Sequence, residues 1–241
     1  MTRRRFKTAF ILGAGLGTRL RPLTERCPKP LLPVEGRPVI TYAMDRLIEA
    51  GVDRLIVNTH HLPEVYEEKF PDRSWRGATI TFRHEPVLLD TGGGLKNIED
   101  LLEDDQSIFC YNGDVFWEPD LLRLARFHEE KKAEVTLALR STGPLLNVDI
   151  DERGEVCDLR HTFGQRGVKS CQFSGVYALE TSFLQNLEEG RVESVIPAFL
   201  RRIATRPGSI MGVIMDDGSW NDIGTVEEYE RLKGDRHEFG R

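Results

Sequence analysis

The sequence predicts an α/β fold in which a Rossmann-like mixed, mainly parallel sheet is flanked by helices and carries a small antiparallel lobe. Short apolar runs alternate with amphipathic stretches up to about residue 140, and shorter extended runs separated by glycines follow from residue 147. Such alternation is typical of a sheet with both faces covered by helices. With 241 residues, 39% of them apolar, the chain is long enough to bury one full core.

The first strand is predicted over residues 8–12, an apolar run that leads directly into a glycine-rich stretch. A helix over 38–50 follows and ends before Gly51. The other elements expected in this part are strands over 54–58, 79–84, 106–111 and 134–140 and helices over 95–102 and 119–131. Ligands of such sheets bind at the carboxyl ends of the strands, so residues that follow strands are the candidates for a site.

The pattern beyond residue 145 favours an antiparallel lobe. Its expected strands cover 148–151, 154–159 and 172–179. Helices after Glu180 and Glu193 should pack back on the sheet, and a strand over 209–215 should return the chain toward Asp222.

A phosphate-binding loop is indicated by Gly13, Gly15 and Gly17, which directly follow the first strand. Glycines adopt backbone angles closed to other residues, which lets amide N–H groups converge on an anion. Arg19 and Lys29 add positive charge to the same stretch. A tight turn with incidental arginines is the plain alternative.

Two common nucleotide-binding designs do not fit this loop. Pro22 would interrupt the long helix that follows a dinucleotide-binding turn, and the next strand ends in Asn58-Thr59-His60 without an acid for the ribose. A Walker loop is excluded because Gly17 leads to Thr18-Arg19 instead of Lys-Ser or Lys-Thr.

Three separated motifs resemble the signatures of sugar-1-phosphate nucleotidyltransferases. The run from Leu12 to Thr24 with Pro28-Lys29-Pro30 is similar to the family's glycine-rich signature. Asn112-Gly113-Asp114 resembles its metal-binding aspartate motif, and the run from Trp220 to Thr225 its second metal motif. The resemblance extends from residue 8 to about residue 232. It departs at Gly13, where the family usually has alanine, a change expected to be harmless.

The resemblance implies transfer of a nucleoside monophosphate from a nucleoside triphosphate to a sugar 1-phosphate. Because two anions must approach each other, the site needs cations and positioning rather than a covalent nucleophile. Arg19 and Lys29 are the implied catalytic residues, and Asp114 and Asp222 the implied Mg²⁺ ligands. Implied nucleotide contacts are Leu12, Gly13, Ala14, Gly15, Gly17, Thr18, Arg19, Asp90, Gly92 and Gly93; implied sugar contacts are Asn112, Ser174 and Gly175.

Substrate preference is indicated by Asp90-Thr91-Gly92-Gly93-Gly94, which resembles the base-recognition segment of N-acetylmuramate 1-phosphate uridylyltransferases. Glycine amides of this segment are expected to read the edge of the base. Like those enzymes, the sequence lacks a Glu-Lys-Pro motif near Asp158. UTP with N-acetylmuramate or a related amino-sugar 1-phosphate is therefore favoured. GTP with mannose 1-phosphate stays open, as does a non-catalytic nucleotide-sugar binding or regulatory module.

One domain over residues 1–241 is expected, without linkers or repeats. Its nucleotide-binding part should span about 8–140, its sugar-binding lobe about 145–205, and its second metal motif 220–225. No hexapeptide repeats of a C-terminal β-helix follow.

Charge and composition point to small-molecule substrates. A net charge of −6, from 33 basic and 39 acidic residues, argues against nucleic-acid binding. Arg3-Arg4-Arg5 resembles an export signal, but no hydrophobic segment follows, so neither export nor a membrane partner is expected. Four scattered cysteines fit reduced thiols and a cytoplasmic location. The sequence carries no sign of oligomeric state.

Several other side chains are expected to be structural. We expect His60 and His61 to form hydrogen bonds within their loop, and Trp220 to pack. His128 lies in a highly charged helix and is expected to be solvated.

Overall fold

The computed structural model describes residues 6–102, 106–164 and 167–235, so the arginines at positions 3–5 lie outside the described residues. Its main feature is a ten-stranded sheet within these ranges. From one edge its strands are β11 (Val156–Leu159), β10 (Val148–Ile150), β12 (Lys169–Glu180), β7 (Ser107–Asn112), β1 (Phe6–Leu12), β4 (Arg54–Thr59), β6 (Ala78–His84) and β5 (Ser74–Trp75). β9 (Val135–Arg140) also pairs with β12, and β13 (Ile210–Ile214) pairs with β9.

The sheet is mixed and mainly parallel, as the sequence predicts. β1 pairs in parallel with β4 on one side and β7 on the other, and β4 pairs in parallel with β6. The carboxyl ends of these four strands therefore meet at one edge. β12 runs antiparallel to both β7 and β9.

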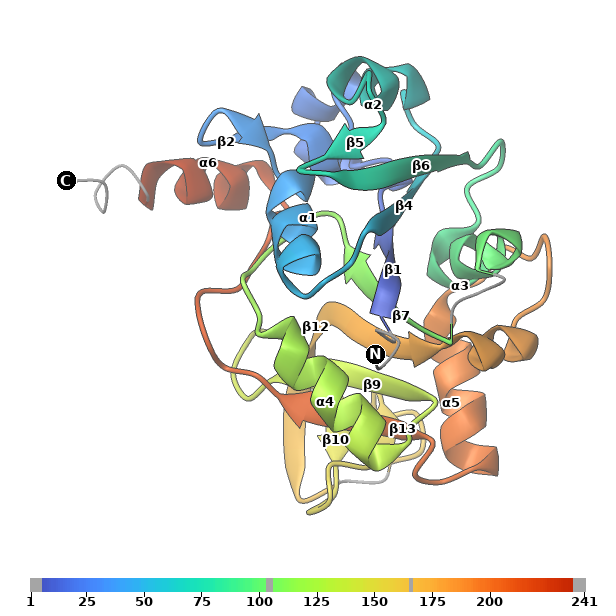
Figure 1. Cartoon of the computed structure of the whole chain (residues 1–241). Coiled ribbons are helices and arrows are strands. Elements are labelled where there is room, and N and C mark those ends of the chain that lie inside the picture. The colour runs from blue at the N-terminus through green and yellow to red at the C-terminus, as the bar shows by residue number, and fades with distance from the viewer. Residues whose placement is uncertain (1–5, 103–105, 165–166, 236–241) are drawn as a thin grey trace.

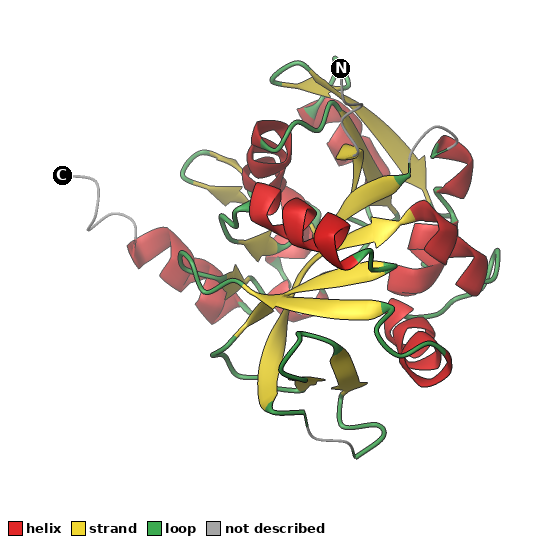
Figure 2. Cartoon of the chain, turned by 60° about the horizontal axis from the view of Figure 1, so that its bottom comes forward, coloured by secondary structure: helices red, strands yellow, loops and turns green. Residues whose placement is uncertain are grey.

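Helices cover both faces of the sheet (Figures 1 and 2). The apolar residues of α1 (Ile40–Glu49), α2 (Pro63–Lys69) and α4 (Leu121–Lys131) join one buried cluster, whereas those of α3 (Asp90–Lys96) and α5 (Val195–Thr205) join a second. α6 (Val226–Asp235) projects from the left of Figure 1 and packs Tyr229 into a third cluster. None of the helices in the described ranges combines the length and apolar character needed to cross a bilayer.

Short elements connect these layers. Two small antiparallel pairs lie outside the main sheet: β2 (Pro33–Val34) with β3 (Arg37–Pro38), which form a hairpin, and β8 (Val115–Phe116) with β14 (Asn221–Asp222), which are distant in sequence. Single 3-10 turns cover Thr18–Leu20, Leu23–Glu25, Lys29–Leu31, Glu99–Leu101 and Thr181–Asn186.

The helix predicted over residues 95–102 begins earlier, because α3 runs through the three glycines and ends at Lys96. Glycine disfavours helix, which is why this segment reads as a loop in the sequence. Here the missing side chains let another segment approach: a Cβ on Gly93 would lie 2.2 Å from the Arg191 carbonyl oxygen. Packing against this segment outweighs the poor helix propensity.

The antiparallel lobe is not separate from the main sheet. β12 has 12 residues; its first part pairs with β10, its last part pairs with β7, and β9 pairs with both its middle and its last part. An irregularity between Phe173 and Tyr177 interrupts the pairing with β9. One strand thus fixes the lobe relative to the carboxyl edge of the sheet.

His128 is completely buried, so the expectation that it is solvated is wrong. Its ring nitrogens lie 2.8 Å from Thr136 Oγ1 and 2.9 Å from Glu180 Oε1. Leu121, Leu124 and His128 are the buried residues of α4. Their spacing places all three on one helical face, so the position follows from periodicity even though the neighbouring residues are charged.

Replacing His128 with Ala should lower the free energy of unfolding by about 2–4 kcal/mol, because the change leaves a cavity and deprives two polar groups of a partner. Urea denaturation measures this loss. Leu122→Ala is the matched control on the same helix, since Leu122 is 48% exposed, and should cost less than about 1 kcal/mol. Equal losses from the two variants would contradict the assigned role of the buried histidine.

Candidate active site

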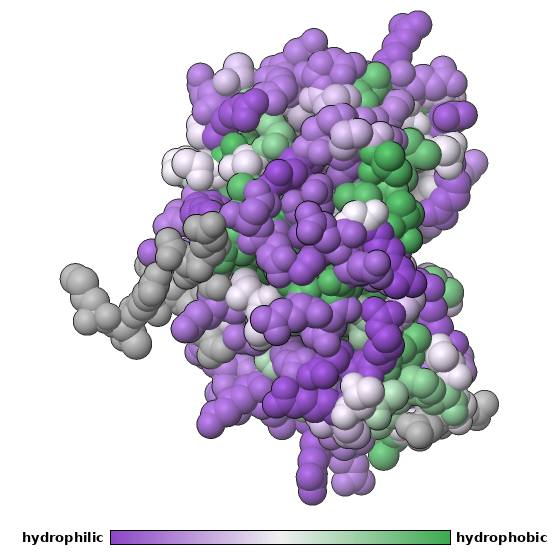
Figure 3. Space-filling view, turned by 90° about the vertical axis from the view of Figure 1, so that its right-hand side faces the viewer, coloured by the Kyte–Doolittle hydropathy of each residue, from purple (hydrophilic) through white to green (hydrophobic). Residues whose placement is uncertain are grey.

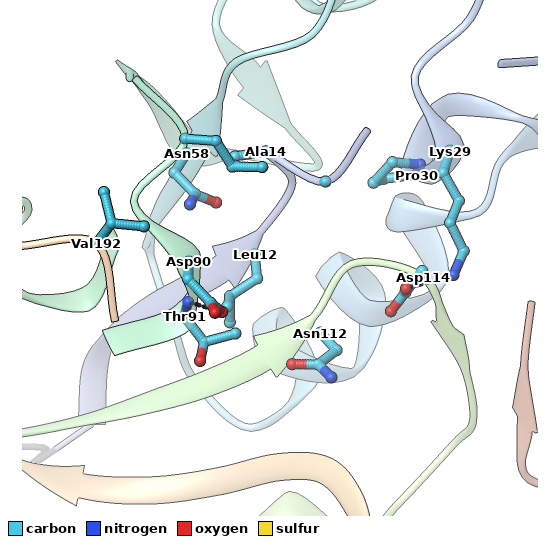
Figure 4. A pocket seen from close by; sticks show the side chains of 12 residues that line it. Leu12, Ala14, Lys29, Pro30, Asn58, Asp90, Thr91, Asn112, Asp114 and Val192 are labelled. Carbon is cyan, nitrogen blue, oxygen red and sulfur yellow. Dashed lines mark hydrogen bonds and ion pairs between the residues drawn. The ribbon is translucent and has the colours of Figure 1, made fainter. Parts of the chain in front are cut away.

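Two neighbouring cavities open at the carboxyl edge of the sheet. The first has a volume of about 370 Å³ and the second about 190 Å³, and Asn112 lines both. The first is lined by Leu12, Ala14, Gly15, Lys29, Pro30, Asn58, Leu88, Asp90, Thr91, Asn112, Asp114 and Val192 (Figure 4). The second is lined by Asn112, Val115, Leu145, Asn147, Val148, Leu159, Arg160, Gln172, Phe173, Ser174, Gly175, Ile196, Trp220 and Asp222.

Lys29, Asp114 and Asp222 meet where the cavities join. Lys29 Nζ lies 2.5 Å from Asp114 Oδ2 and 3.5 Å from Asp222 Oδ1. Asp114 follows β7, and the pairing of β14 with β8 sets Asp222 opposite Val115. Three segments distant in sequence thereby bring one cation and two carboxylates together.

The two carboxylates have the chemistry of a Mg²⁺ site. The pKa of Asp222 is raised by burial and by the neighbouring charge of Asp114, and Lys29 opposes that rise. Among the described residues Asp222 Oδ1 is buried without a hydrogen-bond partner, and its ion-pair partner there is the Lys29 ammonium at 3.5 Å. Within the described ranges no group of three or more His, Cys, Asp or Glu side chains could hold a metal. Two carboxylates nevertheless fit Mg²⁺, because this ion commonly keeps waters and binds substrate phosphates alongside few protein ligands.

Arg19 lies beside the segment that carries Asp222, next to Gly224. Its guanidinium nitrogens would be 3.4 and 3.6 Å from a Cβ on Gly224, two residues after Asp222. Arg19 and its neighbour Thr18 are exposed and line neither cavity. The guanidinium is therefore exposed and lies next to the segment that follows Asp222.

The glycine loop is fixed by a buried chain of hydrogen bonds. The Gly13 N–H donates to Asn58 Oδ1 at 2.7 Å, and Asn58 Nδ2 donates to Glu85 Oε1 at 2.7 Å. Glu85 is completely buried and also accepts the Leu89 N–H at 3.0 Å. Asn58 and Glu85 connect the first loop to the start of α3, and sequence reasoning did not assign them to the site. Their positions could have identified them as site residues, because Asn58 lies near the carboxyl end of β4 and Glu85 directly follows β6.

The predicted nucleotide contacts separate into two groups. Leu12, Ala14, Gly15 and Asp90 line the first cavity. The other predicted contacts do not line it: Gly13, Gly17, Thr18, Arg19, Gly92 and Gly93. The Gly13 amide is occupied by Asn58, and Gly17 adopts a positive φ of 61° before the turn at Thr18–Leu20. Gly13 and Gly17 therefore fix the conformation of the loop without lining the first cavity.

The amides of Gly92 and Gly93 are expected from the sequence to hydrogen-bond the edge of the base, but in the structure they bond within the protein. Both N–H groups donate to the Glu193 carbonyl oxygen, at 2.8 and 3.1 Å. They hold the segment that carries Val192, which lines the first cavity. Figure 4 shows Asp90, Thr91 and Val192 at the end of this cavity opposite Lys29.

The predicted sugar contacts lie together in the second cavity. Gly175 has a φ of 83°, and a Cβ there would lie 2.6 Å from Asn112 Nδ2, so this position requires glycine for Asn112 to keep its place. The Ser174 hydroxyl donates to the Ala138 carbonyl oxygen at 2.8 Å. Trp220 packs against the first buried cluster, lines the second cavity, and donates from Nε1 to the Ser174 carbonyl oxygen at 2.9 Å.

The paired histidines form loop hydrogen bonds, as predicted. His60 Nδ1 lies 2.7 Å from the Glu85 carbonyl oxygen, and His61 Nε2 lies 2.6 Å from the Thr24 carbonyl oxygen. Both rings thus support loops behind the first cavity.

The structure explains why residue 13 is glycine, because the space around it leaves little room for a side chain. A Cβ there would lie 2.7 Å from the Asn58 carbonyl oxygen and 2.9 Å from Tyr66 Oη. We expect Gly13→Ala to lower the free energy of unfolding by about 1–3 kcal/mol, because backbone must move to admit the methyl group. Urea denaturation beside Gly15→Ala, whose Cβ would meet nothing within 4 Å, provides the matched comparison. If Gly13→Ala unfolds at the same urea concentration as Gly15→Ala, the close approach does not constrain the residue.

Comparison with known proteins identifies relatives along nearly the whole chain. It is 35% identical over 234 residues to a mannose-1-phosphate guanylyltransferase of Mycobacterium tuberculosis, covering 94% of this chain and 64% of that protein. It is 28% identical over 239 residues to a UTP–glucose-1-phosphate uridylyltransferase of Synechocystis, covering 92% of this chain and 61% of the relative. The chain thus spans about three fifths of the length of these relatives.

A solved structure shares the fold. The crystal structure of a UDP-glucose pyrophosphorylase complexed with UDP-glucose superimposes with a TM-score of 0.80 at 17% identity, covering 97% of this chain and 99% of that one. A sequence model of the nucleotidyl transferase family matches residues 8–238. Because this match spans nearly the whole chain, the protein belongs to the nucleotidyl transferase family.

Proposed function

We propose that the protein transfers a nucleoside monophosphate from a nucleoside triphosphate to a sugar 1-phosphate in a Mg²⁺-dependent reaction, releasing pyrophosphate and an NDP-sugar. The observation that carries this proposal is the cluster of Lys29, Asp114 and Asp222 at the junction of two cavities. Membership of the family and the activities named for the relatives support it.

Each cavity suits one substrate. Leu88 and Val192 give the first cavity apolar walls that suit a nucleobase, and its other end holds Lys29 for the phosphates. The second cavity, lined by Asn112 and Gly175, would take the sugar. In this proposal residues 8–140 bind the nucleotide, 145–205 the sugar, and 220–225 complete the metal site within one domain.

The reaction joins an oxygen of the sugar phosphate to the α-phosphorus of the triphosphate, and the bond to pyrophosphate breaks on the opposite side. Repulsion between two anions is the main obstacle. Lys29 would leave the carboxylates to contact the phosphate that changes partners, and Arg19 would approach the triphosphate or departing pyrophosphate with its planar donors. Mg²⁺ bound by Asp114 and Asp222 would supply charge neutralisation and a template for both phosphates.

Two substrate pairs are supported by different observations. The mycobacterial relative is named for mannose 1-phosphate and guanylyl transfer, which supports GTP with mannose 1-phosphate. The glycine-rich segment after Asp90 is similar to that of uridylyltransferases for N-acetylmuramate 1-phosphate, which supports UTP with an acidic amino sugar.

The test is pyrophosphate release across UTP, GTP, ATP, CTP and dTTP, each with mannose, glucose, N-acetylglucosamine and N-acetylmuramate 1-phosphates. We expect a pair with UTP or GTP to give the highest kcat/KM. A protein that binds NDP-sugars but releases no pyrophosphate from any pair would be a binding or regulatory module.

Asp114→Asn and Asp222→Asn should each lower kcat by about 100-fold or more, because each removes a negative oxygen ligand for the ion that neutralises the reacting phosphates. Both variants should remain folded, since each retains the shape of its side chain. The increase in Tm that Mg²⁺ gives the wild type should disappear in both.

Asp217→Asn is the control, because Asp217 is exposed, lies five residues before Asp222 and lines neither cavity. It should keep wild-type turnover and the Mg²⁺ effect on Tm. Near-normal pyrophosphate release from either active-site variant would contradict the proposed mechanism.

A further inference from the structure

Arg160 is a charged side chain that the proposed reaction does not use. It lines the second cavity, where Asp222 is the only other charged lining residue within the described parts of the chain. Its backbone N–H donates to the Asn147 carbonyl oxygen at 2.7 Å. Its guanidinium has neither an ion pair nor a hydrogen bond among the residues that the structure describes. The cavity wall therefore presents an exposed positive charge that no described side chain pairs.

The turn that carries Arg160 is held by a buried carboxylate. Asp158 is completely buried and accepts the N–H groups of Leu159 at 2.7 Å, Thr162 at 3.0 Å and Phe163 at 3.0 Å. Arg160 itself has a φ of 58°, a backbone conformation that non-glycine residues rarely adopt. Three backbone donors to one carboxylate fix this turn, and with it the backbone position from which the Arg160 side chain extends.

Arg160 lies at the end of the second cavity remote from the reacting phosphates. The residue before it, Leu159, pairs with Val148, which pairs in turn with Cys171 of β12. Asn112 contacts β12 at Gly175. The four residue steps from Cys171 to Gly175 correspond to roughly 13 Å of extended strand. A sugar whose 1-phosphate lies near Asp222 would direct a substituent on the other side of its ring toward Arg160.

We propose that Arg160 selects a sugar 1-phosphate that carries a carboxylate on the sugar. The planar guanidinium matches a carboxylate through two parallel hydrogen bonds, whereas sugar hydroxyls need no charged partner. The lining of the same cavity also includes the apolar side chains of Leu145 and Leu159, which offer a carboxylate no competing charge. This inference rests on the proposed function, because it assigns the second cavity to the sugar.

The test compares matched sugar 1-phosphates that differ in charge. Glucuronate 1-phosphate is paired with glucose 1-phosphate, and N-acetylmuramate 1-phosphate with N-acetylglucosamine 1-phosphate, each with the best nucleoside triphosphate. The wild type should favour a carboxylated sugar by about ten-fold or more in kcat/KM, the effect of one charge-assisted contact. Arg160→Gln should remove most of this preference by raising KM for the carboxylated sugar, with a much smaller effect on its neutral partner.

Two control variants separate charge recognition from folding. Arg160→Lys keeps the charge but not the planar fork, and should retain part of the preference. Arg153→Gln changes an exposed arginine that lines neither cavity, and should behave as the wild type. Glucose 1,6-bisphosphate tests a second phosphate as the anion. Its preference over both carboxylated sugars, lost in Arg160→Gln, would overturn the assignment to a carboxylate.

The outcomes also distinguish this inference from the proposed function. Turnover that favours neutral sugars, or an Arg160→Gln variant with the same KM increase for charged and neutral sugars, overturns the role of Arg160 and leaves the transferase reaction intact. If no pair releases pyrophosphate, the proposed function fails. Calorimetric binding of the carboxylated sugar 1-phosphates to the wild type and Arg160→Gln then decides the inference directly: tighter binding by the wild type supports it, and equal affinity rejects it.

Discussion

The repulsion between Asp114 and Asp222 is the constraint on which the site depends. Burial and the neighbouring carboxylate raise the pKa of Asp222, and the Lys29 ammonium offsets part of this cost by lying against both side chains. Two otherwise separate cavities join at this cluster. Two carboxylates held close together repel each other, and a cation placed between them reduces that repulsion. The proposed transfer between two anionic substrates needs positive charge at the same place.

The framework around this cluster is held by buried polar groups and close backbone approach. Glu85 and Asn58 connect the glycine loop to α3, while Gly92 and Gly93 connect α3 to the segment before α5. Apolar side chains gather in and beside the hollow on the side of the molecule shown in Figure 3, which is otherwise mostly hydrophilic. The shape of the cavities therefore depends on buried residues that support their walls as well as on the residues that line them.

Much of the fold follows from local pattern. The expected strands agree with β1, β4, β6, β7 and β9 to within a few residues, because most of these strands are short apolar runs, as buried strands usually are, and β6 alternates between buried and exposed residues. α3 was misplaced because tertiary contacts with Glu193 outweigh the low helix propensity of glycine. His128 was misjudged because the charges of neighbouring residues were given more weight than its periodicity with Leu124.

The sequence by itself determined the layered sheet, the family resemblance and the set of residues that carry the proposed chemistry, because these depend on residue type and local spacing. Only the tertiary structure decided which of those residues face a cavity. It assigned the amides of Gly13 and Gly92 to internal acceptors, placed Asp222 beside Asp114, and set Arg160 in the wall of the second cavity. The reason is physical: contacts between segments distant in the chain leave no periodic signal in either segment alone.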